Sequence, residues 1–192
     1  MIGLIQKVLL DLVEKAGGRE AVLEVKRRAE VPADKSFRLD VAYSDDEFRR
    51  LFAATCDVLR VTPQQACVAY ADAFGRDALV RFPAWFAMCK TGRQFLEKQP
   101  LIHNAFATGL ADPAARKAVT DKFQVTSLGD ELVTRYRSPN RLCALYKALA
   151  QWMLDHYGDR ATIDEPRCLL RGDDECEIRL RWAPDEETRN DA

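Results

Sequence analysis

Apolar side chains recur at the spacing of an amphipathic helix through most of the first hundred residues of the chain. In residues 2–16 they fall on one face, and Gly17–Gly18 ends that pattern as a helix C-terminus does. A second helix is expected over residues 19–29. Ser44–Glu47 and Thr62–Gln65 each have the sequence of a capping box, in which a hydroxyl and a polar side chain three residues later bond each other's free backbone amides. Each box predicts the start of a helix.

The pattern changes after about Lys122. Alternating apolar positions on either side of Gly129–Asp130 predict two strands that are joined by a turn. Ser138 is then expected to cap a helix whose first position is Pro139, and Gly158 is expected to end that helix. This part of the chain therefore alternates strand, helix and strand.

A second hairpin is expected near the end of the chain, with Cys168–Leu170 and Cys176–Leu180 as its two arms. The predicted fold class is α+β: a largely helical N-terminal part, followed by a small antiparallel sheet with an intervening helix. Residues 1–182 are expected to form a single domain. The polar residues 183–192 are expected to be a disordered tail.

Composition narrows the function classes. A formal net charge of -1 gives no reason to expect a nucleic acid partner. Charged residues interrupt every apolar run, so we expect no membrane span, and the opening residues lack the basic region and cleavage site of a signal peptide. We therefore expect a cytoplasmic protein. We expect no enzyme, since no nucleophile–base triad, phosphate-binding glycine loop or paired-carboxylate site is recognisable.

His103 is one of only two histidines, and it lies in an apolar stretch that begins at Phe95 and ends at Phe106. A neutral imidazole is a good axial ligand for a haem iron, and a ligand in a dry pocket would have such surroundings. The alternative is a core histidine that bonds a neighbouring backbone carbonyl.

A group of hydrogen-bond donors follows in Tyr136, Arg137, Ser138 and Arg141, at the expected junction of a strand and a helix. A phenol, a hydroxyl and guanidinium groups at a helix N-terminus could together hold carboxylates. The alternative is structural: Ser138 only caps, Tyr136 packs, and the arginines are solvated.

Four stretches together resemble the haem nitric oxide/oxygen binding (H-NOX) domain family, in its bacterial stand-alone form. They are Met1–Val13, the placement of His103, Arg135–Cys143 and Cys168–Cys176, and the resemblance covers residues 1–182. It implies a haem b pocket between the helical part and the sheet, with His103 as the axial ligand of the iron. It also implies that a Tyr-x-Ser-x-Arg motif binds the haem propionates.

By position, Tyr136 and Ser138 are the first two residues of that motif, but the third is Asn140 instead of arginine. Asn140 can donate to a propionate only without charge, and Arg141 follows about a hundred degrees further round a helix. Arg137 and Arg141 stay open as charged donors. A further departure is Thr120, near the place of a family proline that presses on the haem, so a flatter or looser haem is expected.

Leu145 corresponds to the position of a tyrosine that donates to bound dioxygen in oxygen-binding members of the family. The expected distal pocket is largely apolar, which favours nitric oxide, or carbon monoxide, over dioxygen. Its residues are Ile5, Leu9, Tyr70, Phe74 and Leu145. Tyr146 should point about a hundred degrees away from Leu145, and it is the residue that could overturn this prediction.

Cys143, Cys168 and Cys176 are candidate zinc ligands, as in some stand-alone relatives. A structural zinc needs four ligands, and Glu165 and His156 are the two candidates for the fourth. A pair of free thiols or a reversible disulfide is the alternative.

The resemblance implies a haem-based gas sensor in which nitric oxide weakens the iron–histidine bond and frees the helix around His103. The implied partner is a separate histidine kinase or cyclic-dinucleotide enzyme. Two alternatives stay open. One is a haem-free ligand-binding or interaction module of the same fold, and the other is a zinc or thiol redox sensor at Cys143, Cys168 and Cys176.

Overall fold

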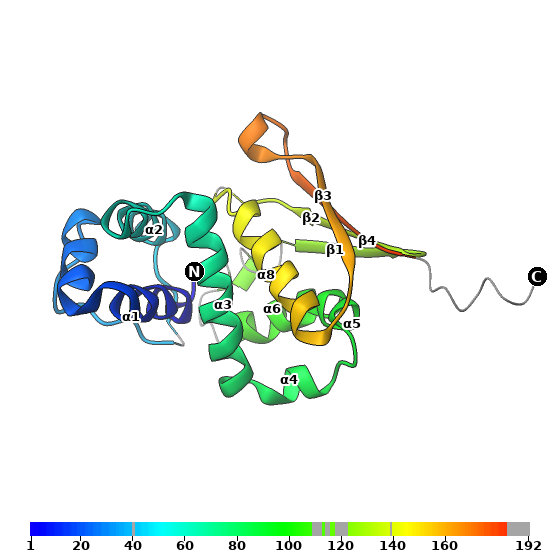
Figure 1. The fold of residues 1–192 in the computed structure, drawn as a ribbon, viewed down its shortest axis with the longest axis horizontal. Helices are drawn as coiled ribbons and strands as arrows, with labels where there is room; N and C mark the ends of the chain where they lie inside the picture. The colour runs from blue at the N-terminus through cyan, green and yellow to red at the C-terminus, as the bar shows by residue number, and fades with distance from the viewer. Residues whose placement is uncertain (40, 109–112, 114–115, 118–122, 139, 184–192) are drawn as a thin grey trace, which may run out of the picture.

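The computed structural model describes residues 1–39, 41–108, 113, 116–117, 123–138 and 140–183 (Figure 1). The helices of the described chain include α1 Gly3–Arg28, α2 Asp45–Leu59, α3 Pro63–Arg81, α4 Pro83–Ala87, α5 Gly92–Glu97, α6 Gln99–Thr108 and α8 Cys143–Tyr157. The strands are β1 Phe123–Leu128, β2 Glu131–Tyr136, β3 Ala161–Arg167 and β4 Cys176–Trp182. The predicted α+β class is confirmed. None of the described helices has both the length and the hydropathy to cross a bilayer.

The predicted break in the first helical pattern lies at Gly18, where φ is 73°. Glycine adopts this left-handed conformation readily because it has no Cβ. The chain kinks there and resumes its helix, so the two predicted helices form one bent element, α1.

Only one of the two expected capping boxes forms completely. Thr62 and Gln65 bond each other's backbone amides at the start of α3. Ser44 accepts a hydrogen bond from Asp46 N at the start of α2, but the Glu47 carboxylate pairs with Lys35 at 2.5 Å. The reciprocal half of the box at Ser44 was therefore a wrong prediction, because an ammonium attracts the carboxylate more strongly than a backbone amide.

The sheet is antiparallel, with the strand order β1-β2-β4-β3. The first hairpin forms as predicted, with Leu128 opposite Glu131. The second hairpin forms, but its first arm was wrong: β3 ends at Arg167, and residues 169–171 form a short 3-10 turn. Within the described residues Tyr136 on β2 lies opposite Cys176 on β4, which brings the end of β2 beside the cysteines.

Helix α8 begins at Cys143, five residues later than the predicted cap at Ser138. Asn140 N donates to Ser138 Oγ at 3.3 Å, and Arg141 N donates to Ser138 O at 3.1 Å, so these residues form a tight turn. Arg141 has a φ of 51°, which a right-handed helix does not allow. Ser138 therefore stabilises a turn and caps no helix, and the helical angle expected between Asn140 and Arg141 does not apply.

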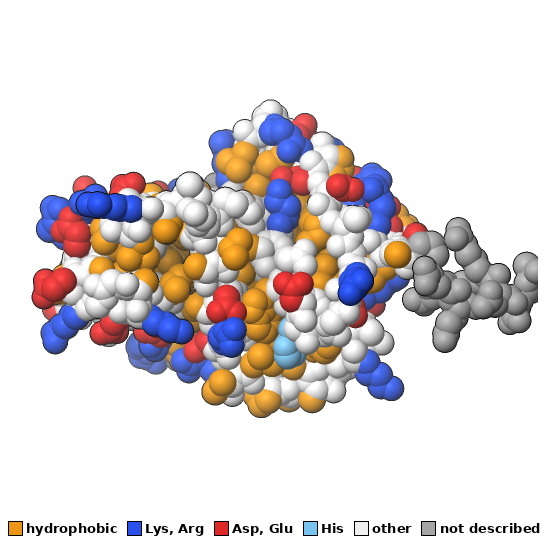
Figure 2. Space-filling view, viewed as in Figure 1, with side chains coloured by type: hydrophobic (Ala, Val, Ile, Leu, Met, Phe, Trp, Pro, Cys, Tyr) orange, Lys and Arg blue, Asp and Glu red, His pale blue; other side chains and the backbone are white. Residues whose placement is uncertain are grey.

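Two hydrophobic clusters make up the core of the described chain. One joins α1, α2 and α3, and the other joins the region of α4 to α6 with the sheet and most of α8. Helix α8 belongs to both, since Leu145 is in the first cluster and Tyr146 is in the second. It lies beside α3 in the middle of the molecule (Figure 1). On the face in Figure 2, positive and negative side chains are interspersed around the exposed apolar ones.

Candidate functional site

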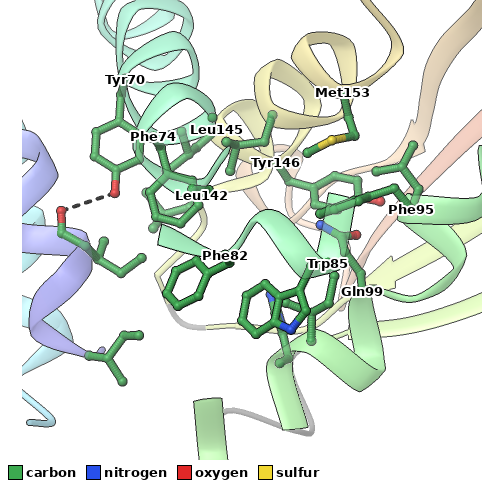
Figure 3. Close-up of a pocket in the computed structure, with 18 of the residues that line it drawn as sticks. Tyr70, Phe74, Phe82, Trp85, Phe95, Gln99, Leu142, Leu145, Tyr146 and Met153 are labelled. Carbon is green, nitrogen blue, oxygen red and sulfur yellow. Dashed lines mark hydrogen bonds between the residues drawn. The ribbon is translucent and has the colours of Figure 1, made fainter. Parts of the chain in front are cut away.

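An apolar cavity of about 230 Å³ lies where the two clusters meet (Figure 3). Its wall draws on α1, α3, α4, α5, α6 and α8 together with the end of β2. An engineered dry cavity of about 150 Å³ in another protein binds benzene, so this cavity has room for a larger apolar ligand. Its lining includes Ile5, Tyr70, Phe74, Phe82, Trp85, Phe95, Gln99, His103, Tyr136, Asn140, Leu142, Leu145, Tyr146, Leu149 and Met153.

His103 reaches the cavity from α6, which begins at Gln99 and has Pro100 at its second position. Proline is well tolerated in a first helical turn because it needs no backbone N–H there. Gln99 and His103 are one turn apart, and both line the cavity. The helix that carries His103 thus has Pro100 in its first turn.

The opposite wall comes from α1, α3 and α8. The Tyr70 hydroxyl donates to the backbone oxygen of Ile5 at 3.1 Å, and Phe74 stacks on the Tyr70 ring with centroids 5.9 Å apart. Burial raises the pKa of Tyr70 far above its usual range, so the phenol stays neutral. Leu145 lines the cavity as expected. Leu9 is fully buried in the helical cluster and does not line the cavity, so it does not belong with the other four.

Tyr146 also lines the cavity, but on another side from Leu145. Its hydroxyl shares a buried hydrogen bond of 2.7 Å with Thr134 on β2, and burial raises its pKa to about 12. Figure 3 shows Tyr146 beside Phe95 and Gln99, whereas Leu145 lies toward Phe74. This separation is the one expected of consecutive helical residues.

Tyr136 and Ser138 meet at the end of β2. Tyr136 is buried and lines the cavity, and its hydroxyl accepts a hydrogen bond of 3.3 Å from Leu142 N. Burial raises the pKa of Tyr136, and hydrogen bonds with Ser138 and Leu142 N lower it in part. Ser138 is buried behind the cavity wall instead of lining it.

Asn140 lines the cavity and joins the two halves of the molecule. Its Nδ2 donates to Asp45 Oδ2 at 2.6 Å, and the other oxygen of Asp45 accepts from the amino group of Met1 at 2.5 Å. Because a carboxylate only accepts, this pairing fixes which end of the amide faces Asp45. Asn140 Oδ1 is buried and receives no hydrogen bond from the described residues.

Neither candidate arginine lines the cavity. Arg137 Nε donates to Glu175 Oε2 at 2.6 Å, away from the cavity wall. Arg141 is exposed, and its left-handed backbone belongs to the turn described above. Thr120, the other predicted departure from the family pattern, lies outside the described residues.

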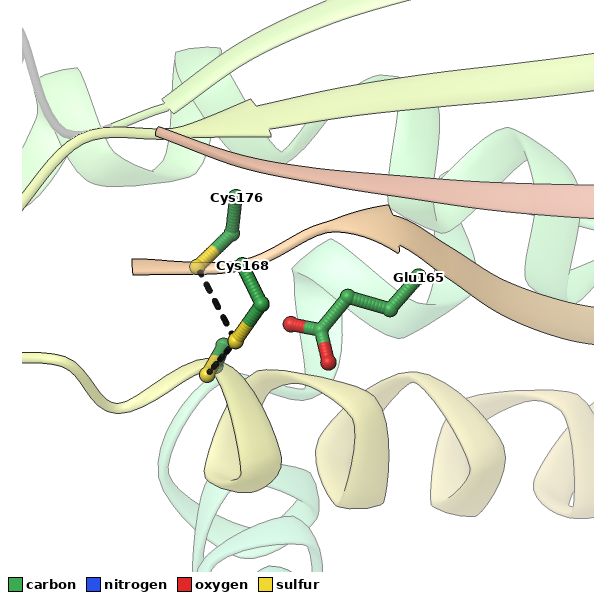
Figure 4. A group of neighbouring side chains, drawn as sticks. Glu165, Cys168 and Cys176 are labelled. Atoms are coloured by element: carbon green, nitrogen blue, oxygen red, sulfur yellow. Dashed lines mark hydrogen bonds between the residues drawn. The ribbon is translucent and has the colours of Figure 1, made fainter. Parts of the chain in front are cut away.

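The three predicted cysteines do meet, next to the end of β2, where Cys176 lies opposite Tyr136 (Figure 4). Cys168 Sγ lies 3.5 Å from Cys143 Sγ and 4.0 Å from Cys176 Sγ. A Glu165 carboxylate oxygen completes a group whose four ligand atoms all lie within 4.8 Å of one another. Burial raises the pKa of Cys143 and of Cys176. At Glu165 burial also raises the pKa, but Lys147 at 2.7 Å and the Cys168 and Cys143 thiols together outweigh it, so the pKa is lowered.

His156, the alternative fourth ligand, lies elsewhere. Its ring stacks on Trp152 with centroids 5.3 Å apart and an interplanar angle of 5°. Of the two candidates, the structure therefore brings Glu165 to the cysteines.

Several cavity residues were not singled out from the sequence. Phe82 and Trp85 stack with centroids 4.4 Å apart at the junction of α3 and α4, and both line the cavity. Gln99 and Met153 were also missed. The aromatic-rich stretch around Pro83 was a usable signal for the first pair, but α4 has only five residues and so shows no period.

A cavity between a helical half and a small sheet, with a histidine in its wall, defines a domain that can enclose an apolar cofactor. The model of the haem-NO-binding family matches residues 2–165. The chain belongs to this family, the H-NOX family of haem-based gas sensors.

Solved structures with the same fold carry the family name. An H-NOX protein from Shewanella oneidensis in the Fe(II)NO state is 18% identical and has a TM-score of 0.81, over 96% of this chain and 100% of that one. An oxygen-binding H-NOX domain related to soluble guanylate cyclases, solved as its oxygen complex, is 14% identical with a TM-score of 0.74, over 96% of each chain. An A71G variant from K. algicida is 20% identical with a TM-score of 0.75, over 98% and 100%. No curated protein matches the chain.

Proposed function

We propose that this chain senses nitric oxide through a haem b whose iron is bound by His103. The observation that carries the proposal is that His103, on α6, lines the same apolar cavity as Tyr70 on α3 and Leu145 on α8. When bound, the haem supplies a coordination position for a gas. The protein supplies the axial imidazole, a dry pocket and the groups at the pocket edge.

The wall opposite His103 supports the choice of gas. Its polar group is the Tyr70 hydroxyl, and that hydrogen is committed to the Ile5 backbone oxygen. Leu145 and Phe74 offer no donor. A wall without an available donor favours nitric oxide, or carbon monoxide, over dioxygen, which needs a donor for its developing negative charge.

At the pocket edge we assign the propionates to Tyr136 and Asn140, with Ser138 in support. Tyr136 lines the cavity, and Asn140 keeps one amide hydrogen beyond the one that it gives to Asp45. Arg137 and Arg141 face elsewhere. The chain would therefore bind the propionates with neutral hydrogen-bond donors, and its haem affinity would be lower than with a charged donor at the same place.

The test is the absorption spectrum of the ferrous protein, purified with haem supplied, before and after addition of nitric oxide. We expect a Soret band that shifts with nitric oxide and that a His103→Ala variant alters. A protein without a Soret band, or a band that is the same in His103→Ala, would contradict the proposal and favour a haem-free module of the same fold.

For the output we propose a separate partner, either a histidine kinase or a cyclic-dinucleotide enzyme, and a sensing role without catalysis for this chain. His103 is the attachment of α6 to the cofactor, and α6 neighbours β1 and α5. Release of that attachment would free α6 to move against the rest of the molecule. A change in a candidate partner's activity that requires both nitric oxide and His103 would support this route.

A second function is proposed for the cluster of three thiols and one carboxylate that is formed by Cys143, Cys168, Cys176 and Glu165. Three sulfur atoms and one carboxylate oxygen within 4.8 Å of one another form a donor set that suits zinc. Metal analysis after expression in zinc-supplemented medium should give one zinc per chain, and Cys176→Ser should lose it. His156→Ala should retain it, and loss of zinc in that variant would contradict the assignment of Glu165.

A further inference from the structure

Gln99 places a buried acceptor one helical turn before His103. Its Oε1 atom is shielded from solvent and accepts no hydrogen bond from the described residues, although the side chain lines the cavity. A buried carbonyl oxygen without a donor is destabilising, and folded proteins rarely leave one unmatched. We therefore expect Gln99 Oε1 to receive a hydrogen bond from a donor that becomes available in the cofactor-bound protein.

Two nearby hydroxyls of the cavity wall take part in hydrogen bonds with other groups. The Tyr146 hydroxyl is paired with Thr134, and the Tyr136 hydroxyl lies against Leu142 N. Pro100, the residue after Gln99, has no backbone N–H. The imidazole of His103 lines the same cavity one helical turn away and carries a ring N–H that can be given to Gln99 Oε1.

The spacing on α6 favours this pairing. Side chains four residues apart in a helix are neighbours on one face, and both Gln99 and His103 face the cavity. The Nδ1 atom of His103 is buried, as is Gln99 Oε1. A neutral imidazole that binds a metal through one ring nitrogen carries its proton on the other, and that proton is normally given to an acceptor.

We propose that Gln99 is a positioning residue for His103: Gln99 Oε1 accepts the Nδ1–H proton when Nε2 binds the iron. The bond fixes the tautomer and orientation of the ring and makes the imidazole a stronger ligand. Gln99 thus sets how firmly α6 is attached to the cofactor. This inference rests on the proposed haem function.

The experiment compares three side chains at position 99 by resonance Raman spectroscopy of the ferrous protein reconstituted with haem. Gln99→Leu removes the acceptor and should lower the iron–histidine stretching frequency. Gln99→Glu offers a charged and stronger acceptor and should raise it. Haem affinity in Gln99→Leu should fall by about 10- to 100-fold, the usual effect of losing the hydrogen-bond partner of a metal-bound histidine.

Gln64→Leu is the matched control, because Gln64 is an exposed glutamine at the start of α3 and does not line the cavity. It should leave the stretching frequency unchanged. One frequency shared by the wild type, Gln99→Leu and Gln99→Glu would overturn the inference while leaving haem binding intact. If Gln99→Leu does not fold, an unchanged frequency in Gln99→Glu overturns it alone. A wild-type protein without a Soret band would instead contradict the proposed function.

Discussion

The two walls of the cavity differ in how their polar atoms are used. On the wall formed by α1, α3 and the Leu145 side of α8, the Tyr70 hydroxyl is bonded to the Ile5 backbone oxygen. On the wall with α6 and the end of β2, Gln99 Oε1 and Asn140 Oδ1 are buried without a donor among the described residues. Among the described residues that line the cavity, the first wall has no buried side-chain oxygen that lacks a hydrogen-bond partner, whereas the second has two.

This difference indicates where a cofactor is held and where a gas is admitted. A buried acceptor without a donor costs free energy, and that cost is recovered if the cofactor-bound protein supplies a donor, as proposed for Gln99 Oε1 and His103. An apolar wall whose polar group is already bonded forms no hydrogen bond with a polar ligand, so it disfavours binding of that ligand relative to an apolar one. Each of the following predictions changes one wall and leaves the other intact.

The largest effect is expected from His103→Gly. Loss of the hydrogen-bond partner of a metal-bound histidine typically costs about 10- to 100-fold in affinity, and removal of the imidazole itself should reduce haem affinity by more than that. Free imidazole added to the variant should restore the spectrum of the ferrous wild type. His156→Gly, which removes the other histidine at its stack on Trp152, should bind haem as the wild type does. If His103→Gly without imidazole gave the spectrum of the ferrous wild type, His103 would not bind the iron, and the wall with α6 could not be assigned to holding the cofactor.

Leu145→Tyr should change gas preference, because it adds a donor to the wall that has none available. One hydrogen bond to a charged group contributes about 1.5 to 3 kcal/mol, which corresponds to a gain of about 10- to 100-fold in oxygen affinity. Spectra recorded in air measure the gain. Leu145→Met is the apolar control, and a wild-type protein that already holds oxygen stably would refute the apolar-wall argument.

Asn140→Arg should strengthen haem binding by supplying the charge that the pocket edge lacks. A charge-assisted bond is about twice as strong as a neutral one, a gain of about 1 kcal/mol, or about fivefold in affinity. Asp45, which now accepts from Asn140, limits the gain by competing for the guanidinium. Equal haem affinities in Asn140→Arg and Asn140→Leu would mean that this residue does not touch the propionates.

The smallest effect is expected from Tyr70→Phe. It removes a hydrogen bond worth about 0.5 to 1.5 kcal/mol, and we expect that loss in the free energy of unfolding, measured by urea titration. Gas preference should stay unchanged, since the lost hydrogen pointed at Ile5 and not into the cavity. A large change in gas affinity would show that the Tyr70 hydroxyl interacts with the bound gas, which contradicts its assignment as a group bonded only to Ile5.

Sequence reasoning predicted the parts of the molecule that depend on local pattern. Helical periodicity, the capping box at Thr62 and the turn at Gly129 are all set by residues close together in the chain, and each has its counterpart in the structure. The expected cap at Ser138 failed because Arg141 adopts a left-handed conformation, which no short motif announces. Pattern alone also could not place the start of β3.

The residues of the candidate site that belong to the family motif could be predicted from the sequence. Contacts between residues that are far apart in the chain could not. His103, Tyr136 and Leu145 were singled out from the sequence, and they meet at one cavity. The bond between Asn140 and Asp45 joins residues 95 positions apart, and the pairing of Arg137 with Glu175 depends on strand neighbours. Such contacts are set by tertiary packing, so the sequence left open which arginine would serve the propionates.

The stack of Trp85 on Phe82 at the cavity wall has an optical consequence. An indole beside a bound porphyrin transfers its excitation energy to it, so its fluorescence is quenched when the cavity fills. Emission lost from a variant that keeps Trp85 as its single tryptophan would report entry of a porphyrin at concentrations too low for absorption. The cavity thus contains its own fluorescent probe.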